Sequence, residues 1–247
     1  MGLSDQIAAV LRGRVERAER EDLFRAPLFA CSAADDPGYA ALKTLVGPWH
    51  KSPEELLPGA RTVLSFFIPF TPEVVRAVRE AGVVAPVWGE AYLRANELLD
   101  EIGGAVSGLL RDEGYAAAPI AATHTYDPEK LQSMWSHRSA AALAGLGSFG
   151  VNRMLITGRG SAGRFGTVLT TAGLEPSPAP APDYCLNHKG GRCLICVDAC
   201  PAQALKTGEF APFVCHDRLL ANADRLSEIG FCDVCGKCLA ACPLAVV

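Results

Sequence analysis

The stretch Cys232-Asp-Val-Cys235-Gly-Lys-Cys238-Leu-Ala-Ala-Cys242-Pro243 spaces four cysteines as C-x2-C-x2-C-x3-C-P. An upstream stretch, Cys193-Leu-Ile-Cys196-Val-Asp-Ala-Cys200-Pro201, follows the same pattern but lacks the leading cysteine, because Gly190 stands at that position. Cys185 lies five residues before Gly190 and could supply the missing thiolate. These paired runs decide how the C-terminal part of the chain is built.

The complete run is typical of bacterial ferredoxins with two iron–sulfur clusters, in which the last cysteine of a run binds the other cluster. This crossing rule predicts two ligand sets: Cys185, Cys193, Cys196 and Cys242 in one, and Cys200, Cys235 and Cys238 with one further cysteine in the other. The further ligand is either Cys232, which has ferredoxin spacing, or Cys215, a spare thiol between the runs. The sequence therefore predicts two [4Fe–4S] clusters, and Cys31 is expected to be a buried apolar residue.

Two other uses of cysteine fit the pattern less well. Disulfides form in oxidising compartments, and residues 1–10 have neither the basic start nor the long apolar stretch of a secretory signal. Zinc sites use pairs of cysteines, which does not explain runs of three and four that each end in Cys-Pro. Electron transfer through iron–sulfur clusters is the better interpretation.

Length and composition set wider bounds. The chain has 247 residues, too many for a ferredoxin alone, and 49% of them are hydrophobic, enough for a substantial core. The net charge of −4 gives no overall basic character of the kind that nucleic-acid-binding proteins carry. No apolar run is long enough to span a membrane. We expect a cytoplasmic protein with no membrane and no nucleic-acid partner.

The prolines of EPSPAPAPDY, residues 175–184, favour a stiff, extended connector. We therefore predict a first domain at residues 1–174, a linker at 175–184 and a cluster domain at 185–247. Hydrophobic patterns predict helices at 90–111, at 131–143 and after an N-cap at Ser4, and strands at 62–68, 116–121 and 165–171. Strands interleaved with helices indicate an α/β or α+β fold.

A glycine-rich segment, Gly145-Leu-Gly147-Ser-Phe-Gly150, matches the G-x-G-x-x-G pattern of dinucleotide sites. It follows a predicted helix rather than a strand, and residues 151–174 contain no acidic residue to bind a ribose. The glycines still allow the backbone to approach a bulky ligand closely. Arg153, Arg159 and Arg164 follow without a neutralising acid, which favours an anionic or amide-rich ligand, although a simple turn with solvated arginines remains open.

Three segments together resemble the cobalamin-binding core of epoxyqueuosine reductases and reductive dehalogenases. The first runs from Ser136-His137-Arg138 through Ala144-Gly-Leu-Gly-Ser-Phe-Gly-Val-Asn152, the second is Leu155-Ile-Thr157, and the third is Arg164-Phe-Gly-Thr-Val-Leu-Thr170. A proline-containing linker and a two-cluster module follow in the same order as in those families. The resemblance implies a nitroreductase-like core that holds cobalamin base-off, with one cluster close to the corrin.

The resemblance also implies roles for particular residues. The expected cofactor-binding residues are Gly145, Leu146, Gly147, Ser148, Phe149, Gly150, Asn152, Arg153, Arg164 and Gly166. His124, Tyr126 and Arg138 flank the turn and are the candidate catalytic proton donors. The family often uses an isolated cysteine between the two runs as a ligand, which favours Cys215.

This sequence departs from the family in its substrate markers. Epoxyqueuosine reductases have a catalytic Asp before the turn, but the matching positions are near Lys130 and Leu131, with Asp127 and Glu129 out of register. The helical-repeat region that holds tRNA and the export signal of respiratory dehalogenases are also not recognised.

We therefore expect a cobalamin-dependent iron–sulfur oxidoreductase that acts on a small molecule and receives electrons from an external donor. The alternatives are a non-enzymatic electron carrier or corrinoid reductase that serves a partner protein, and a similar core that binds flavin.

Overall fold

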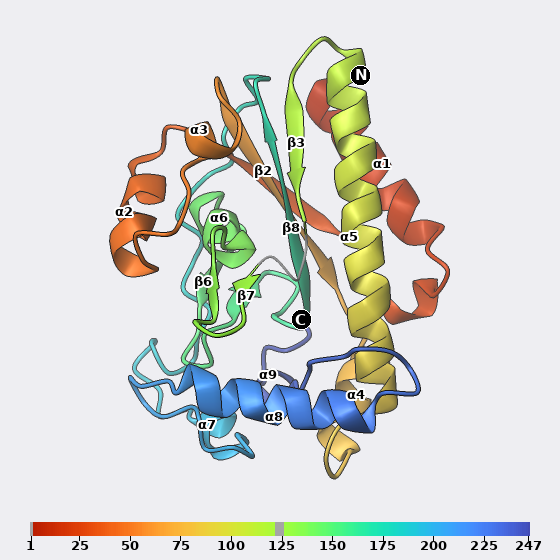
Figure 1. Ribbon diagram of the computed structural model, residues 1–247, viewed down its shortest axis with the longest axis vertical. Helices are drawn as coiled ribbons and strands as arrows, with labels where there is room; N and C mark the ends of the chain where they lie inside the picture. The colour runs from red at the N-terminus through yellow and green to blue at the C-terminus, as the bar shows by residue number, and fades with distance from the viewer. Residues whose placement is uncertain (1, 122–125) are drawn as a thin grey trace.

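The computed structural model describes residues 2–121 and 126–247, and its centre is an antiparallel four-stranded sheet of order β1-β2-β8-β3 (Figure 1). The strands are β1 (Leu28–Ala33), β2 (Thr62–Pro69), β3 (Ala117–Ile120) and β8 (Gly163–Thr170). Two small hairpins lie outside this sheet: β4 (Tyr126–Asp127) with β5 (Gln132–Ser133), and β6 (Gly147–Phe149) with β7 (Leu155–Thr157).

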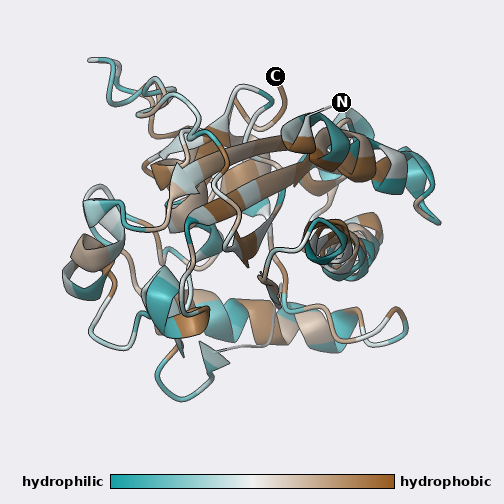
Figure 2. Ribbon diagram, turned by 90° about the horizontal axis from the view of Figure 1, so that it is seen from above, coloured by the Kyte–Doolittle hydropathy of each residue, from teal (hydrophilic) through white to brown (hydrophobic). Residues whose placement is uncertain are grey.

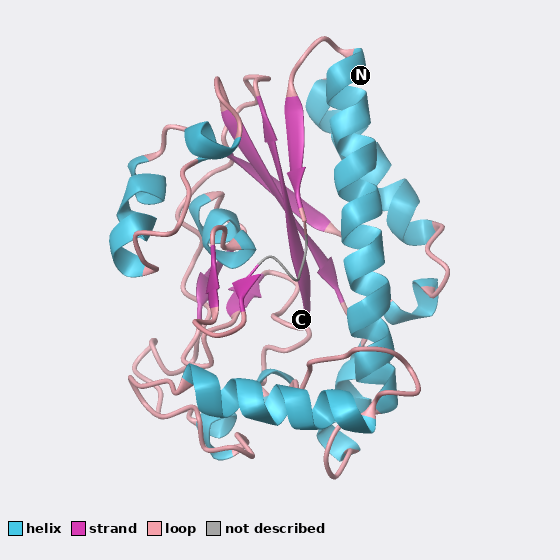
Figure 3. Cartoon of the chain, viewed as in Figure 1, coloured by secondary structure: helices cyan, strands magenta, loops and turns pink. Residues whose placement is uncertain are grey.

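Helices cover both faces of the sheet, as Figure 3 shows. The helices are α1 (Leu3–Glu16), α2 (Pro37–Leu45), α3 (Pro53–Leu56), α4 (Pro72–Glu80), α5 (Pro86–Asp112), α6 (His137–Leu143), α7 (Ile195–Asp198), α8 (Pro212–Arg225) and α9 (Lys237–Ala241), with a 3-10 turn at Glu21–Leu23. Long helix α5 packs on β8 and β3, and α6 packs on β8, β2 and β1.

This double covering explains the sequence of β2. Every residue of TVLSFFIP is buried, because one side of the strand faces the layer of α5 and the other faces α6. A strand buried on both faces has a continuous apolar sequence instead of an alternating one. Figure 2 shows the central strands as largely hydrophobic.

The cysteine-rich segment packs into the same core as the sheet. One buried cluster combines side chains of α1, α4 and α5 with five residues of this segment: Leu226, Cys232, Val234, Leu239 and Ala245. The proline-rich segment also contacts the sheet, since the amide of Ser177 donates to the carbonyl of Cys31 at 2.8 Å. The first part of the chain and the cysteine-rich part therefore share hydrophobic contacts. The domain boundaries at residues 174 and 185 remain a prediction.

The observed elements match most of the sequence-based expectations. The predicted strands correspond to β2, β3 and β8, and the predicted long helix begins four residues earlier, at Pro86, because proline is favoured at the first helical position. Helix α1 begins before Ser4, with Gly2 as the N-cap, so the predicted cap is wrong. The helix predicted at 131–143 is also too long: Leu131 has a φ of +54° and α6 starts only after Ser136.

Packing of α5 against the sheet generates a stability prediction. Ile102 has no exposed surface, and Ile102→Ala should lower the free energy of unfolding by about 2–5 kcal/mol, because it removes buried methyl groups and leaves a cavity. Its exposed neighbour Glu101 provides the control: Glu101→Ala should change stability by less than about 0.5 kcal/mol. Anaerobic chemical denaturation measures both, and equal losses in the two variants would contradict the packing described here.

Candidate functional site

The thiols of the cysteine-rich segment form two groups. Cys196 interacts electrostatically with Cys242, Cys185 and Cys193, which together define the first group. Among the thiols, Cys235, Cys200 and Cys215 raise the pKa of Cys238 more than Cys196 of the first group does, and with Cys238 they define the second group. The first group has the same four members as the ligand set that the crossing rule predicts, and the second group contains Cys215 and not Cys232. The binding of clusters by these thiols stays a prediction.

Cys232 lies apart from both groups. It has no exposed surface, and its thiol donates to the carbonyl oxygen of Gly89 over 3.6 Å. A side chain at Gly89 would contact Cys232 and Leu226, so α5 packs directly on this thiol. Cys232 is thus a core residue here although it completes the ferredoxin spacing. Cys31, also buried, has a pKa raised by burial to about 12, as expected for an apolar, unreactive thiol.

Short helices and left-handed glycines position the thiols. Cys196 is in α7, Cys215 is in the first half of α8, and Cys238 is in α9. Gly236 has a φ of +75° and precedes α9, and a side chain there would collide with the indole of Trp88. The glycine therefore lets the Cys235–Cys238 turn pack against α5.

The grouped thiols are costly to ionise without a counter-charge. Burial, followed by the neighbouring thiols of its group, raises the pKa of Cys238 to about 12, and burial followed by Cys242 raises the pKa of Cys196. Among the described residues, no three His, Cys, Asp or Glu side chains converge on a point where one metal ion could bind. An iron–sulfur cluster needs thiolates, and its positive iron atoms would supply the missing counter-charge.

The first group borders the turn between β6 and β7. A small pocket is lined by the four cysteines of the first group together with Gly150, Val151, Asn152 and Ile156. The neighbouring residues Met154 and Leu155 line a different and larger cavity of about 540 Å³. One hairpin therefore separates the first thiol group from that cavity.

The larger cavity has a cationic and aromatic lining. Its walls include Trp49, Trp135, His137, Arg138 and Arg164. None of its described lining residues is acidic. Burial, then the charge of Arg164, lowers the pKa of Arg138, and burial also lowers the pKa of Arg164. Guanidinium groups remain charged at such sites, so the cavity favours a ligand with anionic or amide oxygens.

Arg164 is held by an aromatic and acidic pair. Its guanidinium lies 4.6 Å from the ring centre of Tyr92, and the hydroxyl of Tyr92 donates to Asp233 at 2.7 Å. Arg138 donates to the backbone oxygen of Arg153 at 2.8 Å, which orients it along the turn between β6 and β7. Both arginines are thus positioned before any ligand binds.

His137 is fixed in a neutral form. Its Nε2 lies 3.1 Å from the carbonyl of Ala121, which can only accept, so Nε2 carries the proton and Nδ1 accepts from the hydroxyl of Thr167 at 2.9 Å. Burial is the main reason that the pKa of His137 falls to about 4. Sequence reasoning gave neither His137 nor Trp135 a role: Trp135 belongs to no quoted motif, and His137 was quoted only within the segment that resembles the cobalamin-binding core.

The predicted cofactor-binding glycines are explained by packing within the protein. Gly145 ends α6 with a φ of +79°, and a side chain there would collide with the carbonyl of Pro178. At Gly147 a side chain would meet the carbonyl of Ile156 across the hairpin, and at Gly166 it would meet the ring of Phe66. None of the three lines the large cavity. Cofactor contact by these glycines therefore remains a prediction.

The other predicted residues are divided between several places. Arg138 and Arg164 line the cavity, whereas Gly150 and Asn152 line the thiol pocket. Leu146 is buried, Phe149 is exposed, Ser148 accepts a hydrogen bond from the amide of Tyr184, and Arg153 donates to the carbonyl of Gly208. His124 lies outside the described residues.

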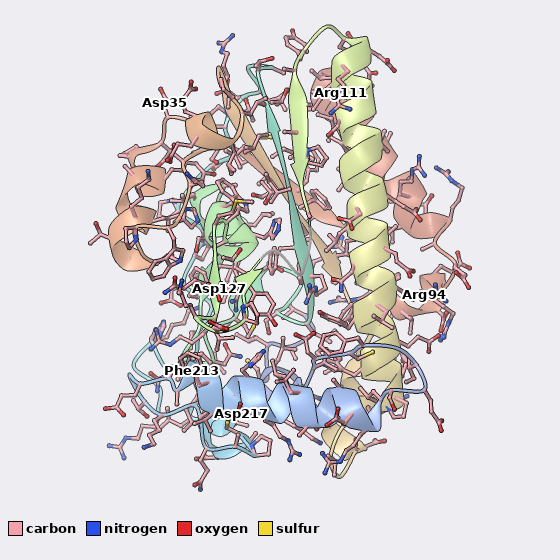
Figure 4. The ribbon with its side chains drawn as sticks, viewed as in Figure 1. Asp35, Arg94, Arg111, Asp127, Phe213 and Asp217 are labelled. Atoms are coloured by element: carbon pink, nitrogen blue, oxygen red, sulfur yellow. The ribbon has the colours of Figure 1, made fainter. Side chains whose placement is uncertain are left out.

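Tyr126 lies beside α8. Its hydroxyl is 3.3 Å from Nε2 of His216, the residue after Cys215, and burial followed by the charge of Asp233 raises the pKa of Tyr126. Figure 4 shows the adjacent residue Asp127 above the part of α8 that carries Phe213 and Asp217. Tyr126 thus remains protonated at neutral pH and contacts α8 at the residue that follows Cys215.

Comparison with known proteins identifies the relatives of this fold. No protein-family model matches the chain. The epoxyqueuosine reductase of Synechococcus sp. (strain CC9605) is 32% identical over 186 residues, which are 74% of this chain and 51% of that protein. The chain therefore spans about half the length of this curated relative.

Solved structures show the same fold. An epoxyqueuosine reductase from Bacillus subtilis has a TM-score of 0.59 at 20% identity, with 97% of this chain and 66% of that chain covered. The catabolic reductive dehalogenase NpRdhA has a TM-score of 0.57 at 17% identity, with 89% and 30% covered. These comparisons confirm the resemblance to epoxyqueuosine reductases and reductive dehalogenases and the mixed α/β fold.

One comparison corrects an expectation about partners. An epoxyqueuosine reductase solved with an epoxyqueuosine-modified tRNA-Tyr stem loop has a TM-score of 0.58 at 18% identity, with 97% of this chain and 66% of that chain covered. The expectation of no nucleic-acid partner, which was inferred from the net negative charge, is therefore wrong: a protein of this fold binds RNA. Within the described part of the chain, no helix is both long and apolar enough to cross a membrane.

The two thiol groups generate a prediction that separates Cys215 from Cys232. In anaerobically reconstituted protein, Cys215→Ala should lose one cluster, or about half of the iron, because it removes a member of the second group. Cys232→Ala should keep all of the iron and lose only some stability, because this thiol packs in the core. Iron and sulfide analysis with EPR of the reduced protein decides the matter. Loss of a cluster in Cys232→Ala with retention in Cys215→Ala would reverse the assignment.

Proposed function

We propose that this chain is a reductase that passes electrons through two [4Fe–4S] clusters to a base-off cobalamin. The observation that carries the proposal is the position of the first thiol group, which lies one hairpin away from a cavity lined by two arginines. Cys185, Cys193, Cys196 and Cys242 would hold one cluster, and Cys200, Cys215, Cys235 and Cys238 the other. Clusters of this type transfer single electrons.

The cavity suits a cobalamin in its chemical character. Arg138 and Arg164 would bind phosphate or amide oxygens of the cofactor, and Trp49 and Trp135 would contact its apolar surface. Both ring nitrogens of His137 are already hydrogen-bonded, so the one histidine among the described lining residues offers no free nitrogen to a metal. This supports a cofactor without a histidine ligand. When bound, cobalamin would supply low-valent cobalt for the reductive step.

The substrate that we propose is a modified nucleoside of tRNA with a removable oxygen. The name of the curated relative and the tRNA-bound structure of similar fold support this substrate class, and the brominated benzoic acid bound to a dehalogenase of the same fold supports a small molecule as the alternative. Reducing an epoxide to an alkene takes two electrons and two protons and releases the oxygen as water. Two clusters of one electron each would match that demand.

Tyr126 is the proton donor that we propose for this reaction. Burial raises its pKa, so the hydroxyl keeps its proton until a stronger base forms on the substrate. His216 lies 3.3 Å away and can orient the hydroxyl. Arg138, the other candidate among the described residues, is better suited to binding because a guanidinium does not release its proton.

The cavity arginines provide a direct test of cobalamin binding. Titration of reconstituted protein with cobalamin should give a saturable base-off spectrum, and Arg138→Gln should weaken binding at least tenfold, because a hydrogen bond to a charged group contributes about 1.5–3 kcal/mol.

Arg94 provides the control, since it lies on the outer side of α5 and forms ion pairs with the exposed carboxylates of Glu19 and Glu97 (Figure 4). Arg94→Gln should bind cobalamin as the wild type does. A wild-type protein that contains both clusters but gives no corrin spectrum would favour the electron-carrier alternative, and flavin bands would favour a flavoprotein.

A further inference from the structure

Asn152 occupies the turn between β6 and β7 and is almost fully buried, with 4% of its surface exposed. Its Oδ1 accepts a hydrogen bond from the amide of Met154 at 3.1 Å, and the amide of Gly150 donates to the carbonyl of Met154 at 2.9 Å. The turn and the side chain therefore hold each other in place.

The other end of this side chain has no acceptor. Nδ2 of Asn152 is buried and makes no hydrogen bond to any described residue. The orientation of the amide is set by the bond to Met154, because exchanging oxygen and nitrogen would place two donors face to face. Buried N–H groups are usually satisfied by protein, by ordered water or by a bound group, so this one is free to donate to an acceptor bound in its surroundings.

The surroundings of Asn152 show where that acceptor would be. Asn152 lines the small pocket that also contains the thiols of Cys185, Cys193, Cys196 and Cys242. The pocket is almost entirely apolar apart from these thiols and the Asn152 amide. The sulfur atoms of a cluster held by this group are thus the acceptors that such a donor would meet.

We infer that Asn152 donates a hydrogen bond from Nδ2 to a sulfur atom of the cluster held by the first thiol group, and thereby raises the reduction potential of that cluster. The inference depends on the proposed iron–sulfur function. Reduction adds negative charge to the cluster and its sulfurs, and an N–H donor stabilises that charge; hydrogen bonds to sulfur are among the determinants of cluster potential. With this hydrogen bond from Asn152, the first cluster is a better electron acceptor than the same cluster would be in a pocket without a donor.

The test is a potentiometric titration of the reconstituted chain of 247 residues, followed by EPR. In Asn152→Leu, the midpoint potential of one cluster should move to a more negative value while the other stays unchanged. Asn152→Asp keeps the oxygen that accepts from Met154 but lacks the donor, and it should move the same potential in the same direction. An exchangeable proton coupled to the reduced cluster should be visible by ENDOR in the wild type and absent from both variants.

Ile156→Val is the matched control, because Ile156 lines the same pocket and offers no donor; both potentials should remain at their wild-type values. Unchanged potentials in Asn152→Leu and Asn152→Asp, with both clusters present by iron analysis, would overturn this inference and leave the proposed function standing. Loss of the cluster from Asn152→Asp would also overturn it, since the residue would then serve assembly. A wild-type protein without iron would instead refute the proposed function, and this inference with it.

Discussion

Main-chain hydrogen bonds join the end of the chain to the start of β8, and the geometry of the site depends on them. The amides of Ser161 and Ala162 donate to the carbonyls of Leu244 and Ala245 at 2.9–3.1 Å. Gly160 makes this approach possible, because a side chain there would lie 2.4 Å from the carbonyl of Ala245. Cys242 and Arg164 lie just outside this contact. It therefore holds the first thiol group and the cavity at a constant separation, which a flexible tether between two modules would not do.

The site holds thiols and guanidinium groups close together in places where little water can stabilise their charges. Four neighbouring thiols lie in a largely apolar pocket, and two guanidinium groups line a cavity whose described walls carry no carboxylate. Buried polar and charged groups are unfavourable unless they are paired. Arg164 already lies near Asp233 through the ring of Tyr92. Positive iron atoms would stabilise the thiolates, and anionic or amide oxygens would stabilise the guanidinium groups that line the cavity, so the two adjacent places favour chemically different cofactors.

Sequence reasoning succeeded where a local pattern has one physical meaning. The apolar runs of β2 and β8 and the periodicity of α5 predicted their elements. The crossing rule named the same four thiols that form the first group, and their role as cluster ligands stays a prediction. Sequence reasoning did not reveal the roles of residues whose neighbours are distant in the sequence. Spacing could not show that Gly89 holds Cys232 in the core, or that Gly145 and Gly147 are required by Pro178 and Ile156. The net charge of the whole chain gave no reliable prediction about RNA binding, because it averages the charges of separate surfaces, and one local surface can bind RNA by itself.

The shared core also has a thermodynamic consequence. Leu239 and Ala240 of α9 pack in the same buried cluster as Val75 of α4 and Leu99 of α5. Ligand binding that occurs only in the folded state shifts the folding equilibrium of every residue in the cooperative unit. The free energy of assembling the proposed clusters would therefore be linked to the folding of the sheet as well as to that of the cysteine loops. Iron supply in the cell would then govern how much of the whole chain folds, and so its abundance as well as its activity.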